Sequence, residues 1–82
     1  MLKSAWLQCE SVDRGMFSDE LAVVVSRSNG STESYFVSAH DVERDRTRVR
    51  VAVRDSGNLF WATVPTNEPV TIPVSKSRVQ LG

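Results

Sequence analysis

The residues of this sequence that could do chemistry are the arginines of one short stretch, "ERDRTRVRVAVRD". An arginine stands at every second position in its first part, and a further one returns near its end: Arg44, Arg46, Arg48, Arg50 and Arg54. Successive side chains of a β-strand point to opposite faces, so on a strand these guanidinium groups share one face and the intervening valines share the other. Trp61 lies on the strand expected to pair with this one. The sequence therefore predicts a binding surface made of Arg46, Arg48, Arg50, Arg54 and Trp61.

The sequence leaves three interpretations of this arginine face open. The first is a solvated face, because four carboxylates within or beside the run can neutralise it by ion pairing: Asp41, Glu43, Asp45 and Asp55. The second, which we place first among the binding functions, is a surface for a protein partner or a second copy of the chain. The alternative binding function is single-stranded nucleic acid, because side chains two apart on a strand lie roughly 6.6–6.8 Å apart and a tryptophan can stack on a base.

No motif of the sequence indicates catalysis, a cofactor or a metal ion. Ser38, His40 and Asp41 are the residue types of a hydrolytic triad, but on a strand Asp41 points away from the face that Ser38 and His40 share. Cys9 and His40 lack the spacing of a zinc site, and no glycine-rich phosphate-binding motif is present. The position of Cys9 in an alternating strand predicts a buried small residue rather than a reactive thiol. We therefore expect a non-enzymatic protein that needs no cofactor.

The length of 82 residues predicts a single domain over residues 1–82 with a small core, since a chain of this size buries only roughly 60–65% of its unfolded surface. Ten basic and ten acidic side chains give a formal net charge of zero, which argues against binding to nucleic acid or a membrane through bulk charge. The single cysteine excludes an intramolecular disulfide, and no apolar stretch is long enough for a signal peptide or a membrane span. We expect a cytoplasmic protein without membrane contact.

Two hairpins must position the arginine face. The first has its turn at Asn29-Gly30, the dipeptide best suited to a two-residue hairpin loop, between "ELAVVVSRS" and "TESYFVSAH". Such a loop pairs Val23 with Phe36 and Val24 with Tyr35. Both faces of this hairpin are then partly apolar, which predicts that it is covered on both sides or lies in a closed barrel.

The second hairpin carries the arginines and has its turn at "DSGN". Counting outward from that turn pairs apolar residues on one face: Val53 with Phe60, Val51 with Ala62 and Val49 with Val64. The opposite face pairs Arg54 with Leu59, Ala52 with Trp61 and Arg50 with Thr63. Trp61 and Leu59 on this opposite face need to be covered from solvent. The cover could come from the chain termini, a second copy or a partner.

Between the hairpins, "SAHDVERDRT" is polar and predicts a charged loop or a single helical turn capped by Ser38. The closing part of the chain, "LFWATVP" followed by "TIPVSKSRVQL", resembles the end of SH3-like barrels. In those barrels a strand with a tryptophan leads to an isoleucine-proline, a short 3₁₀ turn and a last strand. The resemblance implies a barrel topology, but nothing here corresponds to the paired aromatics with which signalling SH3 domains bind proline-rich peptides. We therefore expect an all-β fold, a small antiparallel barrel or roll of five to six strands.

Overall fold

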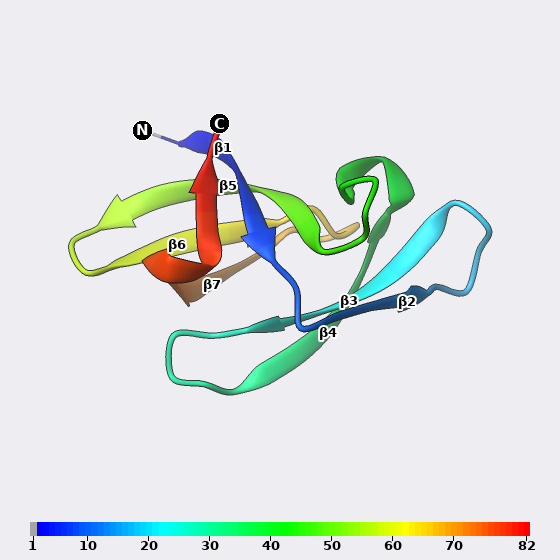
Figure 1. Cartoon of the computed structure of the whole chain (residues 1–82), viewed down its shortest axis with the longest axis horizontal. Coiled ribbons are helices and arrows are strands. Elements are labelled where there is room, and N and C mark those ends of the chain that lie inside the picture. The colour runs from blue at the N-terminus through cyan, green and yellow to red at the C-terminus, as the bar shows by residue number, and fades with distance from the viewer. Residues whose placement is uncertain (1) are drawn as a thin grey trace.

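The structure of the protein, a computed structural model, describes residues 2–82 and consists of two antiparallel β-sheets (Figure 1). The larger sheet has the strand order β7-β6-β5-β1-β8: β1 (Lys3–Gln8), β5 (Arg48–Ser56), β6 (Leu59–Val64), β7 (Val70–Ser75) and β8 (Val79–Leu81). The smaller sheet has the order β2-β3-β4: β2 (Ser11–Arg14), β3 (Glu20–Ser26) and β4 (Thr32–Ser38). More than half of the described residues lie in strands and none in an α-helix, so the expected all-β fold is confirmed.

The number of strands differs from the five to six expected, partly because the chain changes sheets at Cys9 and Glu10. The sequence predicted one strand over "AWLQCESV". In the structure, the backbone N–H of Cys9 donates to the carbonyl of Thr47 at 2.8 Å, whereas that of Glu10 donates to Val24 on β3 at 2.7 Å. The single expected strand therefore becomes β1 of the larger sheet and β2 of the smaller one, and residues 2–82 contain eight strands.

The two sheets lie as two layers around one core (Figure 1). Buried and less buried residues alternate along β3 and β6 and along the central parts of β5 and β7, as the period of a strand requires. The largest fully buried side chains come from both sheets and belong to a single cluster: Leu7, Val23, Val25, Val37, Val49, Val53, Val64, Ile72 and Val74. Burial of each contributes roughly 1.5–3 kcal/mol, so this apolar cluster is what holds the two sheets together.

The first hairpin forms between β3 and β4, but its register is one residue away from the prediction. Val23 lies opposite Tyr35 rather than Phe36, and Val24 lies opposite Ser34 rather than Tyr35. The reason is the loop, which has three residues (28–30) closed by a hydrogen bond from the N–H of Arg27 to the carbonyl of Ser31 at 2.8 Å. Phe36 consequently lies on the outer side of the smaller sheet, where it is 48% exposed.

The second hairpin, between β5 and β6, has the predicted faces but a register shifted by two residues. Val53 pairs with Ala62 rather than Phe60, and Arg54 pairs with Trp61 rather than Leu59. The loop is Gly57-Asn58, one position later than expected, and Gly57 has the positive φ of 76° that a tight hairpin turn needs. A shift of two residues leaves every side chain on its predicted face. The valines therefore stay in the core.

The connecting segments contain two 3₁₀ turns. The first, η1 (Ala39–Asp41), is the predicted single turn after Ser38, whose hydroxyl accepts a hydrogen bond from the backbone N–H of His40 at 3.2 Å. The second, η2 (Lys76–Arg78), separates β7 from β8, so a 3₁₀ turn and a last strand follow β7, as the resemblance to SH3-like barrels implied. Within residues 2–82, no helix has the length and apolar character needed to cross a membrane.

Candidate binding surface

One face of the larger sheet points away from the smaller sheet, and we call it the outer face. Its side chains come from the strand positions that alternate with the buried ones. At the centre of the outer face the strand register arranges them in three rows: Trp6 with Arg50 and Gln80; Ser4 with Ala52, Thr63 and Thr71; and Arg54 with Trp61 and Pro73. Two rows that each contain a tryptophan and an arginine therefore border a middle row of small side chains.

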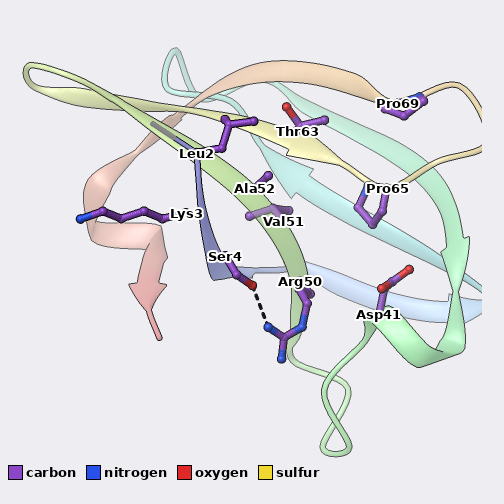
Figure 2. Close-up of a pocket in the computed structure, with 10 residues that line it drawn as sticks. All are labelled: Leu2, Lys3, Ser4, Asp41, Arg50, Val51, Ala52, Thr63, Pro65 and Pro69. Carbon is purple, nitrogen blue, oxygen red and sulfur yellow. Dashed lines mark hydrogen bonds between the residues drawn. The ribbon is translucent and has the colours of Figure 1, made fainter.

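Arg50 is held in place over the first tryptophan. Its guanidinium carbon lies 4.3 Å from the centre of the Trp6 ring, a cation–π arrangement. Its Nη1 donates a hydrogen bond to the hydroxyl of Ser4 at 2.7 Å (Figure 2). No carboxylate of residues 2–82 lies within 4.0 Å of its nitrogen atoms. The guanidinium group is thus fixed in position while its charge is not neutralised, and it is ready to bind an anionic group.

Arg54 and Trp61 face each other across β5 and β6. Arg54 is exposed and, within the described chain, forms no ion pair. Trp61 is half-buried. Together with Leu2 and two threonines they line a shallow hollow of about 280 Å³. The ring of Trp61 is therefore partly covered by its own chain but remains accessible to a ligand.

The other arginines of the run do not extend this surface as the sequence predicted. Because β5 begins at Arg48, Arg44 and Arg46 lie in the turn before it, where Arg46 has a positive φ of 58°. Arg48 does lie on the outer face, but Glu43 binds its Nε at 3.0 Å and its Nη2 at 2.5 Å, and Gln80 accepts a further hydrogen bond. The row of five guanidinium groups is thus reduced to three on β5, of which one is ion-paired.

The turn before β5 explains why the row of arginines is shorter than predicted. The backbone N–H of Arg46 donates to the carbonyl of Glu43 at 2.8 Å, and the N–H of Glu43 donates to the carbonyl of Arg48 at 2.8 Å. The chain therefore reverses between Val42 and Val49, which form an isolated antiparallel bridge. Alternation cannot continue through such a reversal, so the structure brings Arg50, Arg54 and Trp61 together and places Arg46 apart from them.

Two of the carboxylates that could neutralise the arginine face bind cations other than Arg50 and Arg54. Glu43 binds Arg48, as described above. Asp55 binds the ammonium group of Lys76 at 2.9 Å, and this contact holds the pKa of Asp55 below its usual value. Neither carboxylate makes an ion pair with Arg50 or Arg54 in the described chain.

The other two carboxylates, Asp45 and Asp41, lie at the margin of the outer face. Asp45 accepts a hydrogen bond from the hydroxyl of Thr47 at 2.8 Å, which lowers its pKa. Asp41, on η1, lies at the rim of the outer face near Arg50 (Figure 2). No strand position on the described outer face holds an acidic residue. The surface around Arg50 and Arg54 is therefore locally cationic, although the net charge of the chain is zero.

A hollow of about 390 Å³ opens beside Arg50 (Figure 2). Its apolar lining is Leu2, Val51, Ala52, Pro65 and Pro69, and its polar lining is Lys3, Ser4, Asp41, Arg50 and Thr63. This volume is at the lower end of the range for small-ligand pockets. The hollow is open to solvent and mostly apolar, so it suits one or two side chains of a partner better than an enclosed substrate.

Two of the residues considered for catalysis or metal binding, Ser38 and Cys9, have structural roles. The hydroxyl of Ser38 caps η1 by accepting from the backbone N–H of His40. Within residues 2–82, no group of three or more histidine, cysteine, aspartate or glutamate side chains is arranged to hold a metal ion. Cys9 is buried, as predicted, and its burial raises the pKa of the thiol to about 11.

Sequence reasoning missed Trp6, which completes the outer face. Trp6 alternates with Ala5 and Leu7, both fully buried, so strand parity alone would have placed its ring on this face. The signal was therefore present in the sequence. In contrast, Pro65 and Pro69 join the hollow only through the path of the loop between β6 and β7, for which no local pattern gives a signal.

The chain was compared with protein-family models, with curated proteins and with solved structures, and none of these comparisons found a match. The outer face itself is therefore the basis for assigning a function.

Proposed function

We propose that the protein is a non-enzymatic interaction module of the cytoplasm that binds a protein partner, or a second copy of itself, through the outer face. The observation that carries this proposal is the placement of Trp6 with Arg50, and of Arg54 with Trp61, on either side of a row of small side chains. Tryptophan and arginine are enriched at the energetic hot spots of protein interfaces. The apolar hollow beside them offers a partner side chain a place to be buried.

Selection from a phage-displayed library of random peptides, with the folded domain as bait, tests this function. Peptides enriched on the wild type should lose affinity for Trp61→Ala by on the order of 2 kcal/mol or more, because an anchoring ring is removed. They should also lose affinity for Arg50→Ala. Arg44→Ala is the matched control, since it removes the same charge from the exposed turn before β5. A lack of enrichment, or peptides that bind both outer-face variants as well as the wild type, would contradict the proposal.

Single-stranded nucleic acid is the second candidate ligand, and the unpaired charges of Arg50 and Arg54 favour it. A cationic sheet face that carries tryptophans suits a phosphate backbone with stacked bases. Titration of a labelled oligonucleotide at two salt concentrations tests this candidate. Binding should weaken steeply with salt, and each phosphate-contacting arginine changed to alanine should lower the salt slope by about one unit. Absence of binding at low salt would leave the protein partner as the remaining ligand.

The proposal that the module is not an enzyme rests on the hydrogen bonding of Ser38 and His40. The hydroxyl of Ser38 accepts a hydrogen bond from the backbone N–H of His40, and within residues 2–82 it makes no hydrogen bond with the His40 ring that would activate it as a nucleophile. A hydrolytic turnover that His40→Ala abolishes, with the fold intact, would contradict this part of the proposal.

We propose, in addition, that the two sheets form a small, partly open barrel of SH3-like type. The order of β7, η2 and β8 supports it, because a 3₁₀ turn before the last strand is typical of those barrels. A contact between the sheets also supports it: the backbone N–H of Ser28, in the β3–β4 loop, donates to the carbonyl of Pro73 on β7 at 2.8 Å. A solution structure would test this topology through the contacts between these two segments.

A further inference from the structure

We propose that the occupant of the hollow beside Arg50 is the β2–β3 hairpin tip of a second copy of the chain, so that the protein associates head to tail. This inference rests on the proposed function and names the partner. The tip comprises residues 15–19. In the contact, the ring of Phe17 enters the apolar hollow and the carboxylate of Asp19 meets the guanidinium group of Arg50.

The tip presents two large apolar side chains to solvent. Met16 and Phe17 are 78% and 68% exposed, more than any other large apolar residue of the described chain. Three hydrogen bonds fix the loop that carries them: the N–H of Gly15 to the carbonyl of Glu20 at 3.0 Å, the N–H of Met16 to the Glu20 carboxylate at 3.0 Å, and the N–H of Glu20 to the carbonyl of Phe17 at 3.1 Å. A fixed loop loses little conformational freedom on binding, which favours its use as a contact.

The hollow that would receive the tip is also preorganised. Arg50 is positioned by the ring of Trp6 and the hydroxyl of Ser4, and its charge has no ionic partner in the described chain. Leu2, at the rim, is 62% exposed and adds apolar surface to the same hollow. Figure 2 shows the Arg50 side chain beside this apolar lining. An apolar group followed closely by a carboxylate matches such a site.

The charges of the two surfaces are complementary. Residues 15–20 include Asp19 and Glu20 and no cationic residue. Because Glu20 is engaged within the loop, Asp19 is the carboxylate available to a partner. Arg14 and Arg46 line a polar hollow together with Met16 and Phe17, and Asp19 does not line that hollow. The acceptor has Lys3 and Arg50 against the single carboxylate of Asp41, so it attracts an acidic segment.

The tip and the hollow have no residue in common, so a contact between them joins two unlike surfaces. A contact between two unlike surfaces is heterologous and produces a ring or an open chain of subunits. One hairpin tip covers less than the ~800 Å² per partner of a standard interface. We therefore expect weak association, with a Kd on the order of 100 μM.

Sedimentation equilibrium of the wild type and two variants tests this contact. Phe17→Ser removes the ring of the tip and keeps the hollow, whereas Arg50→Glu reverses the charge of the hollow and keeps the tip. The mean mass of the wild type should rise with concentration up to about 1 mM, and each variant alone should remain a monomer. A mixture of the two variants should form a heterodimer and nothing larger, because it contains only one combination of intact tip and intact hollow.

Phe36→Ser and Arg44→Glu are the matched controls, because they make the same changes at exposed positions outside the contact and should leave association unchanged. Circular dichroism verifies the fold of each variant, and Lys3→Glu replaces Arg50→Glu if the latter unfolds. Association that survives both test variants, or a mixture that forms no heterodimer, overturns the head-to-tail contact. A monomeric wild type also overturns it, and the peptide selection with Trp61→Ala then reports separately whether the outer face binds other proteins.

Discussion

The arginines of β5 have different surroundings, and these decide their roles. Arg48 is half-buried, is bound by Glu43 through two nitrogen atoms and contacts Gln80 of β8. Arg54 is exposed and has no ionic partner within residues 2–82. The sequence could show that they share a face, because parity follows from spacing alone. It could not show which one is neutralised, since that depends on where the chain reverses before β5.

This difference predicts unequal effects on stability. Arg48→Ala should lower the free energy of unfolding by about 1 kcal/mol, because it removes a partly buried, two-point ion pair and the packing of the side-chain stem. Arg54→Ala should change it by about 0.5 kcal/mol or less, as exposed charges usually do. Urea unfolding of the two variants measures both values. An equal loss in both would show that the contact between Arg48 and Glu43 contributes nothing to stability.

The thiol of Cys9 gives a second prediction at this scale. Burial raises its pKa from 9.0 to about 11, so the reactive thiolate is disfavoured in the folded protein. A thiol reagent at pH 8 should therefore modify the native protein far more slowly than the urea-unfolded protein. Because the folded-state pKa is the higher one, thiolate formation favours unfolding, and stability should fall as the pH rises from about 9 to about 11. Cys9→Ala should show a smaller fall over this interval, and rapid native modification would be inconsistent with burial.

At the scale of the elements, alternation predicted the faces of the second hairpin but not the shared faces of the first, and it predicted neither register. The valines of β5 are buried as expected, because a slip of two residues conserves the face. The predicted loop of the first hairpin is one residue too short, and that of the second lies one position too early. A glycine next to several polar residues is compatible with more than one turn position, so the sequence does not fix the loop. The change of sheet at Cys9 and Glu10 has no local signal, because its hydrogen bonds go to residues far away in the sequence.

The β2–β3 loop depends on the close approach of the Gly15 and Glu20 backbones, and this dependence can be tested. A Cβ atom at Gly15 would lie 2.8 Å from the carbonyl oxygen of Glu20, closer than the backbone can accept without moving. Gly15→Ala should therefore displace the tip and lower the free energy of unfolding by about 1–3 kcal/mol. Gly57, with a φ of 76° and open space around it, is the comparison: Gly57→Ala should cost about 1–2 kcal/mol through backbone strain alone.

The two substitutions are distinguished by their effect on association. If the tip contacts a second copy, Gly15→Ala should weaken association in sedimentation equilibrium, whereas Gly57→Ala should not. Unchanged stability of Gly15→Ala would mean that the loop accommodates the methyl group, and the description of a fixed tip would then be wrong.

For the whole molecule, net charge is a poor guide to what a surface can bind. Ten basic and ten acidic residues cancel in the chain, yet the acidic ones are absent from the strand positions of the described outer face. The candidate contact groups are also distributed unevenly between the two sheets. Both tryptophans lie on the larger sheet, and the exposed tip belongs to the smaller one. What joins these parts is the shared core.

Because the core is one cluster that spans both sheets, the molecule should unfold as a unit. Val23 on β3 is fully buried, and Val23→Ala should lower the free energy of unfolding by about 2 kcal/mol through lost burial and a cavity. Trp6 and Trp61 report on the larger sheet, while circular dichroism reports on both sheets. In urea, the two signals should therefore shift together, although the substitution lies in the smaller sheet alone. Val24→Ala, at a half-buried neighbouring position, is the control and should cost less. If the tryptophan transition of Val23→Ala stays in place while the circular dichroism transition moves, the two sheets unfold separately, and a common core does not stabilise the outer face.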